Sequence, residues 1–386
     1  MVNILMVTHN HIPDARVEKE SRSLRQAGHK VFIATPEVRN KIAEEAFDKV
    51  FTYSHTYKHN YFNRKAVLDA ALIYEKIILE NNVEAIHAHN IFTAYIASKI
   101  VKKLKIKFIF DDHETWSLWL KERAKKAVGI KNKLLRSYIY LRSISIEKRI
   151  AKLADHIIVT NIMCKPFFEK LKIPSNKITS LENIAFQSEI NIALQSDNLV
   201  VDFFKQDKRK KIVHVYHRSK GKSTKQSRKD ETIDRNFDVF VAAQEKLDDW
   251  VLVLFGEKDP DLEKRGVVFI DFMPRINYLA NIAQADVGLN PLVITPKTII
   301  SSQNRIFEYA KLGVRVISTK TPLLEKNFDN MLIWMNPDEP LEKLLEILKN
   351  IDSYPSGKEL QKYSEKFSWE IEAQKMIDAY REMFTK

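Results

Sequence analysis

The stretch from Ala285 to Thr321 constrains the fold most, because it reads as strand, loop, helix and strand. An apolar strand over 286–291 ends in Asn-Pro, and a loop and an amphipathic helix follow it. Gly313 ends that helix, and residues 314–318 form the next buried strand. Two strands joined through a helix run parallel in one sheet. The stretch therefore predicts an α/β protein.

The start of this helix carries the first candidate site. Arg305 and Glu308 are three positions apart, so they share one helical face. Ser301 and Ser302 are expected N-caps. A helix start favours anions, so the arginine suits a phosphate and the carboxylate suits sugar hydroxyls. The same spacing fits a surface ion pair, and spacing alone leaves both interpretations open.

Length and charge limit the class of protein. A chain of 386 residues suggests two domains. Lys and Arg number 63 against 50 acidic residues, and the resulting net charge of +13 indicates an anionic partner such as nucleic acid, acidic lipid or a phosphate ester. The single Cys164 excludes an intramolecular disulfide and suits a reducing compartment. The first residues resemble a strand rather than a signal peptide, and no apolar run is long enough to span a bilayer, so we expect a cytoplasmic protein.

Strands and helices alternate along the whole chain. The first unit is strand 2–8, helix 17–27 and strand 30–35, which predicts a right-handed crossover. The loop after the first strand lacks a glycine-rich fingerprint, which counts against NAD or FAD, and we expect no cofactor. Further strands are predicted at 85–88, 107–110, 156–160, 212–216, 251–255, 267–270 and 331–335.

Polar residues follow two of these strands, at the sheet edge where open α/β folds bind ligands. Asp112 and His113 come directly after one strand, and histidine beside carboxylates suits acid–base chemistry. His87 and His89 alternate along another strand, which places both rings on one face. No third metal ligand declares itself, so we predict no metal site.

Two basic segments have more than one interpretation. Residues 121–136 hold seven basic residues and one acidic residue among apolar ones, after Trp116 and Trp119. This pattern is typical of a helix on an anionic membrane surface, and a solvated helix face explains it equally well. A linker is expected at 188–210, followed by a basic loop over 217–236. That loop has no recognisable nucleic-acid-binding motif, so we expect it to bind phosphate of a small ligand and expect no nucleic-acid partner.

Several segments together resemble the GT-B-fold glycosyltransferases of the large retaining, nucleotide-sugar-dependent group, similar to glycosyltransferase family 4. The donor-site signature is carried by ADVGLNPL and NRIFEYAKLGVRVIST. The other matching segments are PDARVEKESRSLRQAGHKV, HAHN, DDHE, ADHIIVT and FSWE with the terminal helix. The resemblance covers most of the chain.

This resemblance implies two Rossmann-like domains that face each other across a cleft. Residues 1–190 would form the acceptor domain and residues 205–365 the donor domain, while 366–386 would form a helix that crosses back to the first domain. A sugar would pass from a UDP or GDP sugar to a hydroxyl of a glycan or lipid-linked acceptor. Such a hexosyltransferase-like, metal-independent enzyme would act in polysaccharide biosynthesis, peripherally at the inner face of the membrane.

The resemblance also implies roles for individual residues. Glu308 would bind the ribose, and Arg305 with Asn304 would bind the diphosphate. The leaving diphosphate would be neutralised by Arg218 with Lys220 or Lys222. The catalytic residues would be His113 and Asp112, and the residues facing the acceptor would be Asp14, Arg16 and His89.

Two departures from the pattern leave part of the activity open. Ile300 occupies the position where the family often has a second glutamate, so the donor sugar and the stereochemical outcome stay open. The loop after the first strand lacks the family's glycines. The alternatives are a non-catalytic basic α/β protein that binds nucleic acid, and a GT-B sugar-nucleotide epimerase or phosphorylase.

Overall fold

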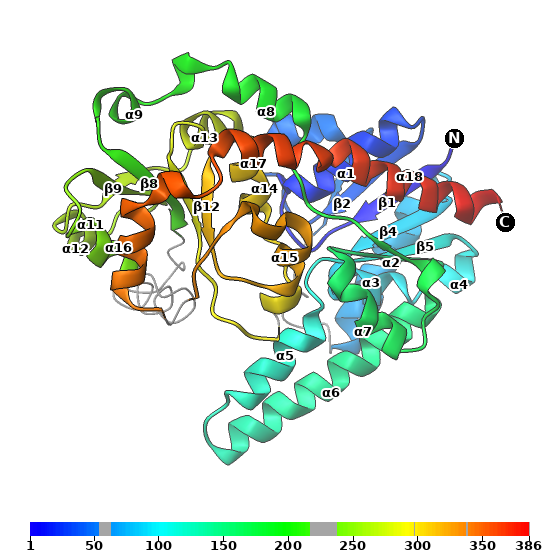
Figure 1. Cartoon of the computed structure of the whole chain (residues 1–386). Coiled ribbons are helices and arrows are strands. Elements are labelled where there is room, and N and C mark those ends of the chain that lie inside the picture. Colours follow the sequence, from blue (N-terminus) through cyan, green and yellow to red (C-terminus); the bar gives the residue numbers. More distant parts are fainter. Residues whose placement is uncertain (54–62, 217–237, 297, 337–338, 386) are drawn as a thin grey trace. The chain divides into compact units, whose positions relative to one another are not determined.

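A computed structural model describes residues 1–53, 63–216, 238–296, 298–336 and 339–385. The chain divides into two compact units (Figure 1). Unit 1 contains Met1–Asn183 and Glu370–Lys386, and unit 2 contains Ile184–Trp369. The predicted diphosphate ligands Arg218, Lys220 and Lys222 lie outside the described residues.

Unit 1 is built on a parallel sheet with the strand order β3-β2-β1-β4-β5-β6-β7. Its strands are β1 (Asn3–Val7), β2 (Lys30–Thr35), β3 (Lys49–Thr52), β4 (Ala85–His89), β5 (Lys107–Asp112), β6 (His156–Val159) and β7 (Ile178–Ser180). The central strands are buried and mostly apolar, apart from His87 and His89 in β4, as expected for a parallel sheet covered on both faces. Every described strand therefore ends at the same edge, and that edge carries the polar residues discussed below.

The helices of unit 1 connect these strands. They are α1 (Ala15–Gln26), α2 (Arg64–Glu80), α3 (Asn90–Ala97), α4 (Val101–Leu104), α5 (Trp116–Lys125), α6 (Ile130–Leu153), α7 (Lys165–Lys170) and the terminal α18 (Trp369–Thr385). Asp14 caps α1, because its side chain accepts hydrogen bonds from the backbone of Arg16 and Val17. Helices α5 and α6 pack against each other and extend beyond the sheet as a helical hairpin (Figure 1).

Unit 2 repeats this architecture with the strand order β10-β9-β8-β11-β12-β13. Its strands are β8 (Lys210–Tyr216), β9 (Trp250–Gly256), β10 (Val268–Ile270), β11 (Val287–Asn290), β12 (Arg315–Ser318) and β13 (Ile333–Trp334). Its helices are α8 (Gln187–Leu194), α9 (Asp202–Gln206), α11 (Asp238–Gln244), α12 (Pro260–Glu263), α13 (Arg275–Ile282), α14 (Asn304–Lys311), α15 (Pro322–Phe328), α16 (Leu341–Lys349) and α17 (Gly357–Tyr363).

The sheet of unit 2 separates two apolar layers. Val251 and Val253 of β9 pack into one layer, whereas Leu252 and Leu254 of the same strand pack into the other. This alternation is the pleat of a strand buried on both faces. One layer lies under α14, since Ile306 and other residues of that helix belong to it, so packing fixes the helix that carries Arg305 and Glu308.

Two local predictions differ from the structure. Residues 188–210 are not a linker: Ile190, Ala193 and Phe204 are buried in the core of unit 2, because α8 and α9 turn apolar faces to it. Neither Ser301 nor Ser302 caps α14, whose N-cap is Gln303 without a side-chain capping bond.

The terminal helix α18 packs within unit 1. Tyr380 is fully buried, and its hydroxyl lies 2.9 Å from Nδ1 of His87 in β4. No helix in the described part of the chain combines the length and apolar character needed to cross a membrane.

Candidate active site

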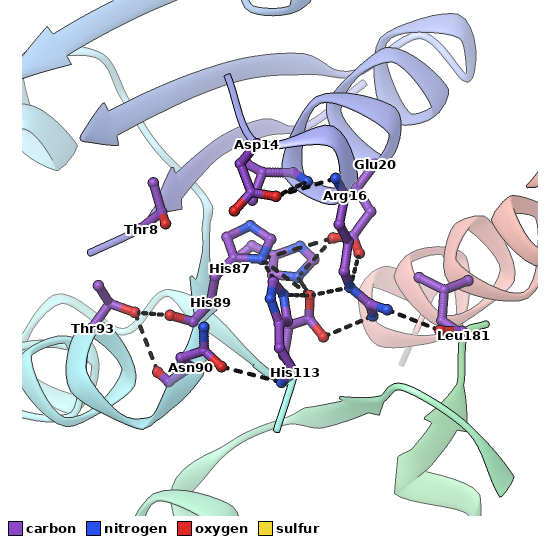
Figure 2. A network of polar contacts seen from close by, with 12 residues as sticks. Thr8, Asp14, Arg16, Glu20, His87, His89, Asn90, Thr93, His113 and Leu181 are labelled. Atoms are coloured by element: carbon purple, nitrogen blue, oxygen red, sulfur yellow. Dashed lines mark hydrogen bonds and ion pairs between the residues drawn. The ribbon is translucent and has the colours of Figure 1, made fainter. Parts of the chain in front are cut away.

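A cluster of charged and histidine side chains lies at the carboxyl edge of the sheet in unit 1 (Figure 2). Strands β4 and β5 supply His87, His89 and Asp111, and α1 supplies Arg16 and Glu20. These five side chains are at most 4% exposed. Because neighbouring parallel strands end together, residues far apart in sequence meet here.

Asp111 is the centre of the cluster. Its Oδ1 lies 3.0 Å from Nη2 of Arg16, and its Oδ2 lies 3.0 Å from Nδ1 of His89 and 2.8 Å from Nε2 of His113. Burial opposes the charge of Asp111, but the charges of Arg16 and His113 and these hydrogen bonds hold its pKa well below the usual value. Asp111 is therefore an ionised carboxylate inside the protein.

Arg16 connects the two carboxylates of the cluster. Besides Asp111, its Nε lies 2.9 Å from Oε1 of Glu20, and its Nη1 donates to the carbonyl of Leu181 at 2.9 Å. Burial raises the pKa of Glu20 well above its usual value, and the nearby charge of Asp111 adds to the rise, which Arg16 only partly offsets. Arg16 thus faces inward as a structural counter-ion. This placement argues against direct contact of Arg16 with an acceptor.

The other two predicted acceptor-side residues differ in exposure. His89 is fully buried, and burial lowers its pKa to about 3, so its ring is neutral. Asp14 is half-buried just before α1, and of the three predicted acceptor-side residues it is the one with exposed surface.

The cluster also contains a possible set of metal ligands that the sequence analysis missed. One ligand atom from each of Glu20, His87, His89 and Asp111 lies within 4.8 Å of the others. However, the rings of His87 and His89 are stacked, with centroids 4.6 Å apart and an angle of 16° between the ring planes. The lone pair of a ring nitrogen lies in the plane of its ring, so one ion cannot lie near both planes. Arg16 already provides a positive charge to both carboxylates. This geometry favours hydrogen bonds among these side chains over the binding of a metal ion.

Asp112 lies on the opposite face of β5 from Asp111, as strand alternation requires. It is 1% exposed, and burial, followed by the nearby charge of Asp112, raises the pKa of the fully buried Glu147 of α6 well above its usual value. Burial raises the pKa of Asp112 to about 7. The carboxyl group of Asp112 is therefore almost fully enclosed, and its catalytic role stays a prediction.

Unit 2 has a pocket of about 480 Å³ at the start of α14, a volume typical of small-molecule sites. The predicted donor ligands Asn304, Arg305 and Glu308 all line it. The remaining lining residues are Val215, Phe255, Phe272, Met273, Arg275, Tyr278, Ser302 and Gln303. The structure thus brings the three described donor-side candidates together.

Glu308 is held by an arginine that the sequence analysis did not identify. Nη1 of Arg275 lies 2.9 Å from Oε1 of Glu308, and Nε of Arg275 lies 2.9 Å from Oε2 of Glu189. Although burial opposes its charge, the two glutamates raise the pKa of Arg275. The alternative of a surface ion pair between Arg305 and Glu308 therefore does not form. Nη1 of Arg305 lies 3.3 Å from Nδ1 of His214 instead. One signal was available: Arg275 begins α13 after β10, and Arg305 is the second residue of α14 after β11.

Comparison with known proteins gives a family match for the first half of the chain. Residues 16–184 match the model of Glycosyltransferase Family 4. Curated protein sequences give no significant match.

Solved structures match the whole chain at low identity. Sucrose-phosphate synthase from Thermosynechococcus elongatus has a TM-score of 0.70 at 14% identity, with 100% of both chains covered. HepE from Anabaena in complex with UDP and glucose gives 0.66 at 10%, covering 99% of this chain and 100% of that one. UDP-GlcNAc 2-epimerase from Neisseria meningitidis bound to UDP-GlcNAc gives 0.61 at 12%, covering 98% and 100%. At these identities the likeness establishes the shared fold.

The two parallel sheets and the structural matches define the GT-B fold, with two Rossmann-like domains. Within this fold, residues 16–184 match the model of Glycosyltransferase Family 4.

Proposed function

We propose that the pocket of unit 2 binds the nucleoside diphosphate of the donor. One observation carries this proposal: Arg305 and Glu308 line the same pocket one helical turn apart, at the start of α14. The first amides of a helix have no partner within the helix and favour an anion, so the diphosphate lies there with Arg305 and Asn304. Glu308 accepts hydrogen bonds from the ribose hydroxyls.

The leaving diphosphate needs positive charge as the glycosidic bond breaks. Arg305 and the start of α14 supply part of it before the reaction begins, which is how preorganised groups stabilise a transition state. In the proposal, Arg218 with Lys220 or Lys222 completes this charge, so transfer needs no metal ion. UDP and GDP are the nucleotides to test first.

The hydroxyl acceptor binds to unit 1 near His113 and Asp14. Both side chains belong to the carboxyl edge of the sheet and keep some exposed surface, unlike the rest of the cluster. We infer a glycan or lipid-linked acceptor of polysaccharide biosynthesis.

The tip of the α5–α6 hairpin supports a membrane location for that acceptor. Val128 and Ile130 are 86% and 80% exposed, and Leu134 and Leu135 are 67% and 57% exposed. Lysines and arginines flank these apolar residues or lie between them: Lys121, Arg123, Lys125, Lys126, Lys131, Lys133 and Arg136. Apolar side chains flanked by positive charge fit an anionic lipid surface, where each Lys or Arg contributes about 1 kcal/mol. This arrangement supports peripheral binding to the cytoplasmic face of a membrane.

A sugar-nucleotide epimerase is the second candidate, because the UDP-GlcNAc 2-epimerase shares the fold over 98% of this chain and 100% of its own. An epimerase converts the donor without an acceptor and releases no new glycoside. A phosphorylase requires phosphate as a co-substrate. A nucleic-acid-binding protein binds oligonucleotides with an affinity that falls steeply with salt, and nucleotides do not change its melting temperature.

One experiment separates these functions. Wild-type protein is incubated with a panel of UDP and GDP sugars, with and without a lipid-linked acceptor, and the release of nucleotide and the glycoside product are measured. Acceptor-dependent release with a new glycoside supports the transferase. The Arg305→Ala and Glu308→Ala variants should lose this activity while keeping the wild-type melting temperature, and wild-type turnover in either would remove the site assignment.

A further inference from the structure

The pocket of unit 2 also contains a tyrosine that the sequence analysis did not identify as a ligand-binding residue. Tyr278 of α13 lines this pocket together with Arg305 and Glu308. Its ring packs edge-on against Phe255 of β9, with ring centroids 5.3 Å apart and an angle of 83° between the ring planes. Phe255 is 1% exposed and belongs to the core of unit 2, so this contact fixes the direction of the tyrosine ring.

The hydroxyl group of Tyr278 is available to a ligand. In the described part of the chain no group forms a hydrogen bond with it, and its oxygen keeps some exposed surface. Tyr309 of α14, by contrast, is 0% exposed. A hydroxyl that is accessible and carried by a fixed ring is a preorganised hydrogen-bond donor, because a ligand does not have to break a contact within the protein to reach it.

The electrostatic surroundings keep this hydroxyl protonated. Burial raises the pKa of Tyr278 well above its usual value, and the charges of Tyr309 and Glu308 add to the rise. The charges of Arg305 and Arg275 oppose it and do not outweigh the burial. Tyr278 is therefore a neutral phenol that acts as a donor at physiological pH, within the field of the same arginines and glutamate that line the pocket.

The carboxylate of Glu308 does not occupy this donor, because it already has another partner. Nη1 of Arg275 lies 2.9 Å from its Oε1. A bound nucleoside diphosphate offers two kinds of partner to the phenol, namely ribose hydroxyls and phosphate oxygens. The ribose hydroxyls have an acceptor of their own in Glu308, whereas a diphosphate has only acceptor oxygens and needs several donors. Arg305 is a charged donor at this position, and Tyr278 adds a neutral one.

Resting on the proposed binding of the donor in this pocket, we propose that Tyr278 binds the diphosphate: its hydroxyl donates a hydrogen bond to a phosphate oxygen beside Arg305. Tyr278 keeps its proton throughout. When the bond to the sugar breaks, its electron pair goes to the leaving diphosphate, and a donor already aimed at that group stabilises the added charge. All of the residues in this proposal belong to unit 2.

The first test removes the hydroxyl alone. Tyr278→Phe keeps the ring against Phe255, so the melting temperature should stay at the wild-type value. Isothermal titration with whichever of UDP and GDP the wild-type protein binds should show an affinity about 10- to 100-fold lower, as expected for a lost hydrogen bond to a charged group. The control Tyr363→Phe removes a hydroxyl from α17, which packs on the same core but does not line the pocket, and should bind like the wild type. Wild-type affinity in Tyr278→Phe overturns the proposal.

The second test separates a phosphate contact from a ribose contact. Each protein is also titrated with the 2′,3′-dideoxy analogue of the same nucleotide. If Tyr278 binds the diphosphate, Tyr278→Phe weakens the binding of both nucleotides by the same factor. An effect that disappears with the analogue assigns the hydroxyl to the ribose and overturns the proposal. Glu308→Gln is the opposite case, because its effect should disappear with the analogue.

Failure of the proposed function gives a different result. If the wild-type protein binds neither UDP nor GDP, the donor site and the role of Tyr278 are both overturned. If the wild type binds one of them, and Arg305→Ala weakens that binding while Tyr278→Phe does not, only the role of Tyr278 is overturned.

Discussion

Arg275 holds Glu308 in place: its Nη1 lies 2.9 Å from Oε1 of the carboxylate, while its Nε binds Glu189 at 2.9 Å. Both Arg275 and Glu308 line the pocket of unit 2. The arginine therefore occupies one oxygen of the proposed ribose ligand and is itself oriented by a second carboxylate. A partner of this kind fixes the geometry of a ligand without touching the reacting atoms.

Replacement of Arg275 should weaken donor binding. Arg275→Gln leaves Glu308 without its counter-ion and free to change rotamer, so we expect the KM for the donor to rise about 10- to 100-fold with a smaller change in kcat. Steady-state kinetics across donor concentrations measure both. Arg265→Gln is the matched control, because Arg265 pairs with Glu245 at 2.6 Å on the exposed surface of the same unit. Equal effects of the two variants would contradict the role of Arg275.

Removal of Arg16 should destabilise unit 1. Arg16→Met leaves Asp111 and Glu20 buried without their shared counter-ion, and breaking such a pair costs about 3–5 kcal/mol. Chemical denaturation measures the change in the free energy of unfolding. Arg39→Met breaks an exposed pair with Glu37 and should cost less than about 1 kcal/mol. Similar losses in both variants would show that the cluster does not need Arg16.

His156 should make the protein less stable in acid. Burial, aided by the charge of Lys165, lowers the pKa of His156 to about 4 from an unfolded value of 6.5. Between these values the unfolded chain binds a proton that the folded chain does not, so stability falls with falling pH, by at most about 1.4 kcal/mol per pH unit for one group.

The variant His156→Gln tests this dependence. It removes the titrating group and leaves an amide that can still bond to Thr179, which lies 2.8 Å from Nε2 of His156. The difference between melting temperatures at pH 7.5 and pH 5 should be smaller in the variant than in the wild type. An unchanged difference would assign the acid sensitivity to other groups.

The apolar tip of the α5–α6 hairpin should control membrane binding. Val128→Glu and Ile130→Glu place negative charge and remove apolar surface at positions that are 86% and 80% exposed. Co-sedimentation with vesicles containing anionic lipid should fall about tenfold or more, with activity on a water-soluble acceptor preserved. Leu72→Glu, at a 62% exposed apolar position of α2, is the control and should bind like the wild type. If the control lost membrane binding as strongly as the two hairpin variants, the net charge of the protein alone would explain the binding.

Much of the fold could be predicted because parallel strands are continuous apolar runs. The second strand was predicted at Lys30–Thr35, as observed, since its burial is nearly complete. Strand β3 at 49–52 was not predicted, because it is half-exposed at the edge of the sheet and lacks such a run. The predicted linker at 188–210 contains α8 and α9 instead, because the polar and basic residues of this stretch obscure the few apolar positions that enter the core, such as Ile190 and Phe204.

The candidate site was predictable only in part. Sequence placed Arg305 and Glu308 on one helix face, and the structure brings both to one pocket. It selected Asp112 beside His113, whereas the structure places Asp111 against that ring. Adjacent residues of a strand face opposite sides, and sequence alone does not show which side faces His113. The pair of Arg275 and Glu308 is separated by 33 positions, and only tertiary structure brings it together.

Isothermal titration with UDP and GDP tests the central claim most directly, because it measures nucleotide binding without an acceptor or a chosen sugar. The account predicts that wild-type protein binds one of them at one site. Glu308→Gln and Arg305→Ala should each weaken that binding at least about tenfold, since each loses a charge-assisted hydrogen bond. Equal affinity in wild type and both variants would contradict the account, because the nucleotide would then lie elsewhere.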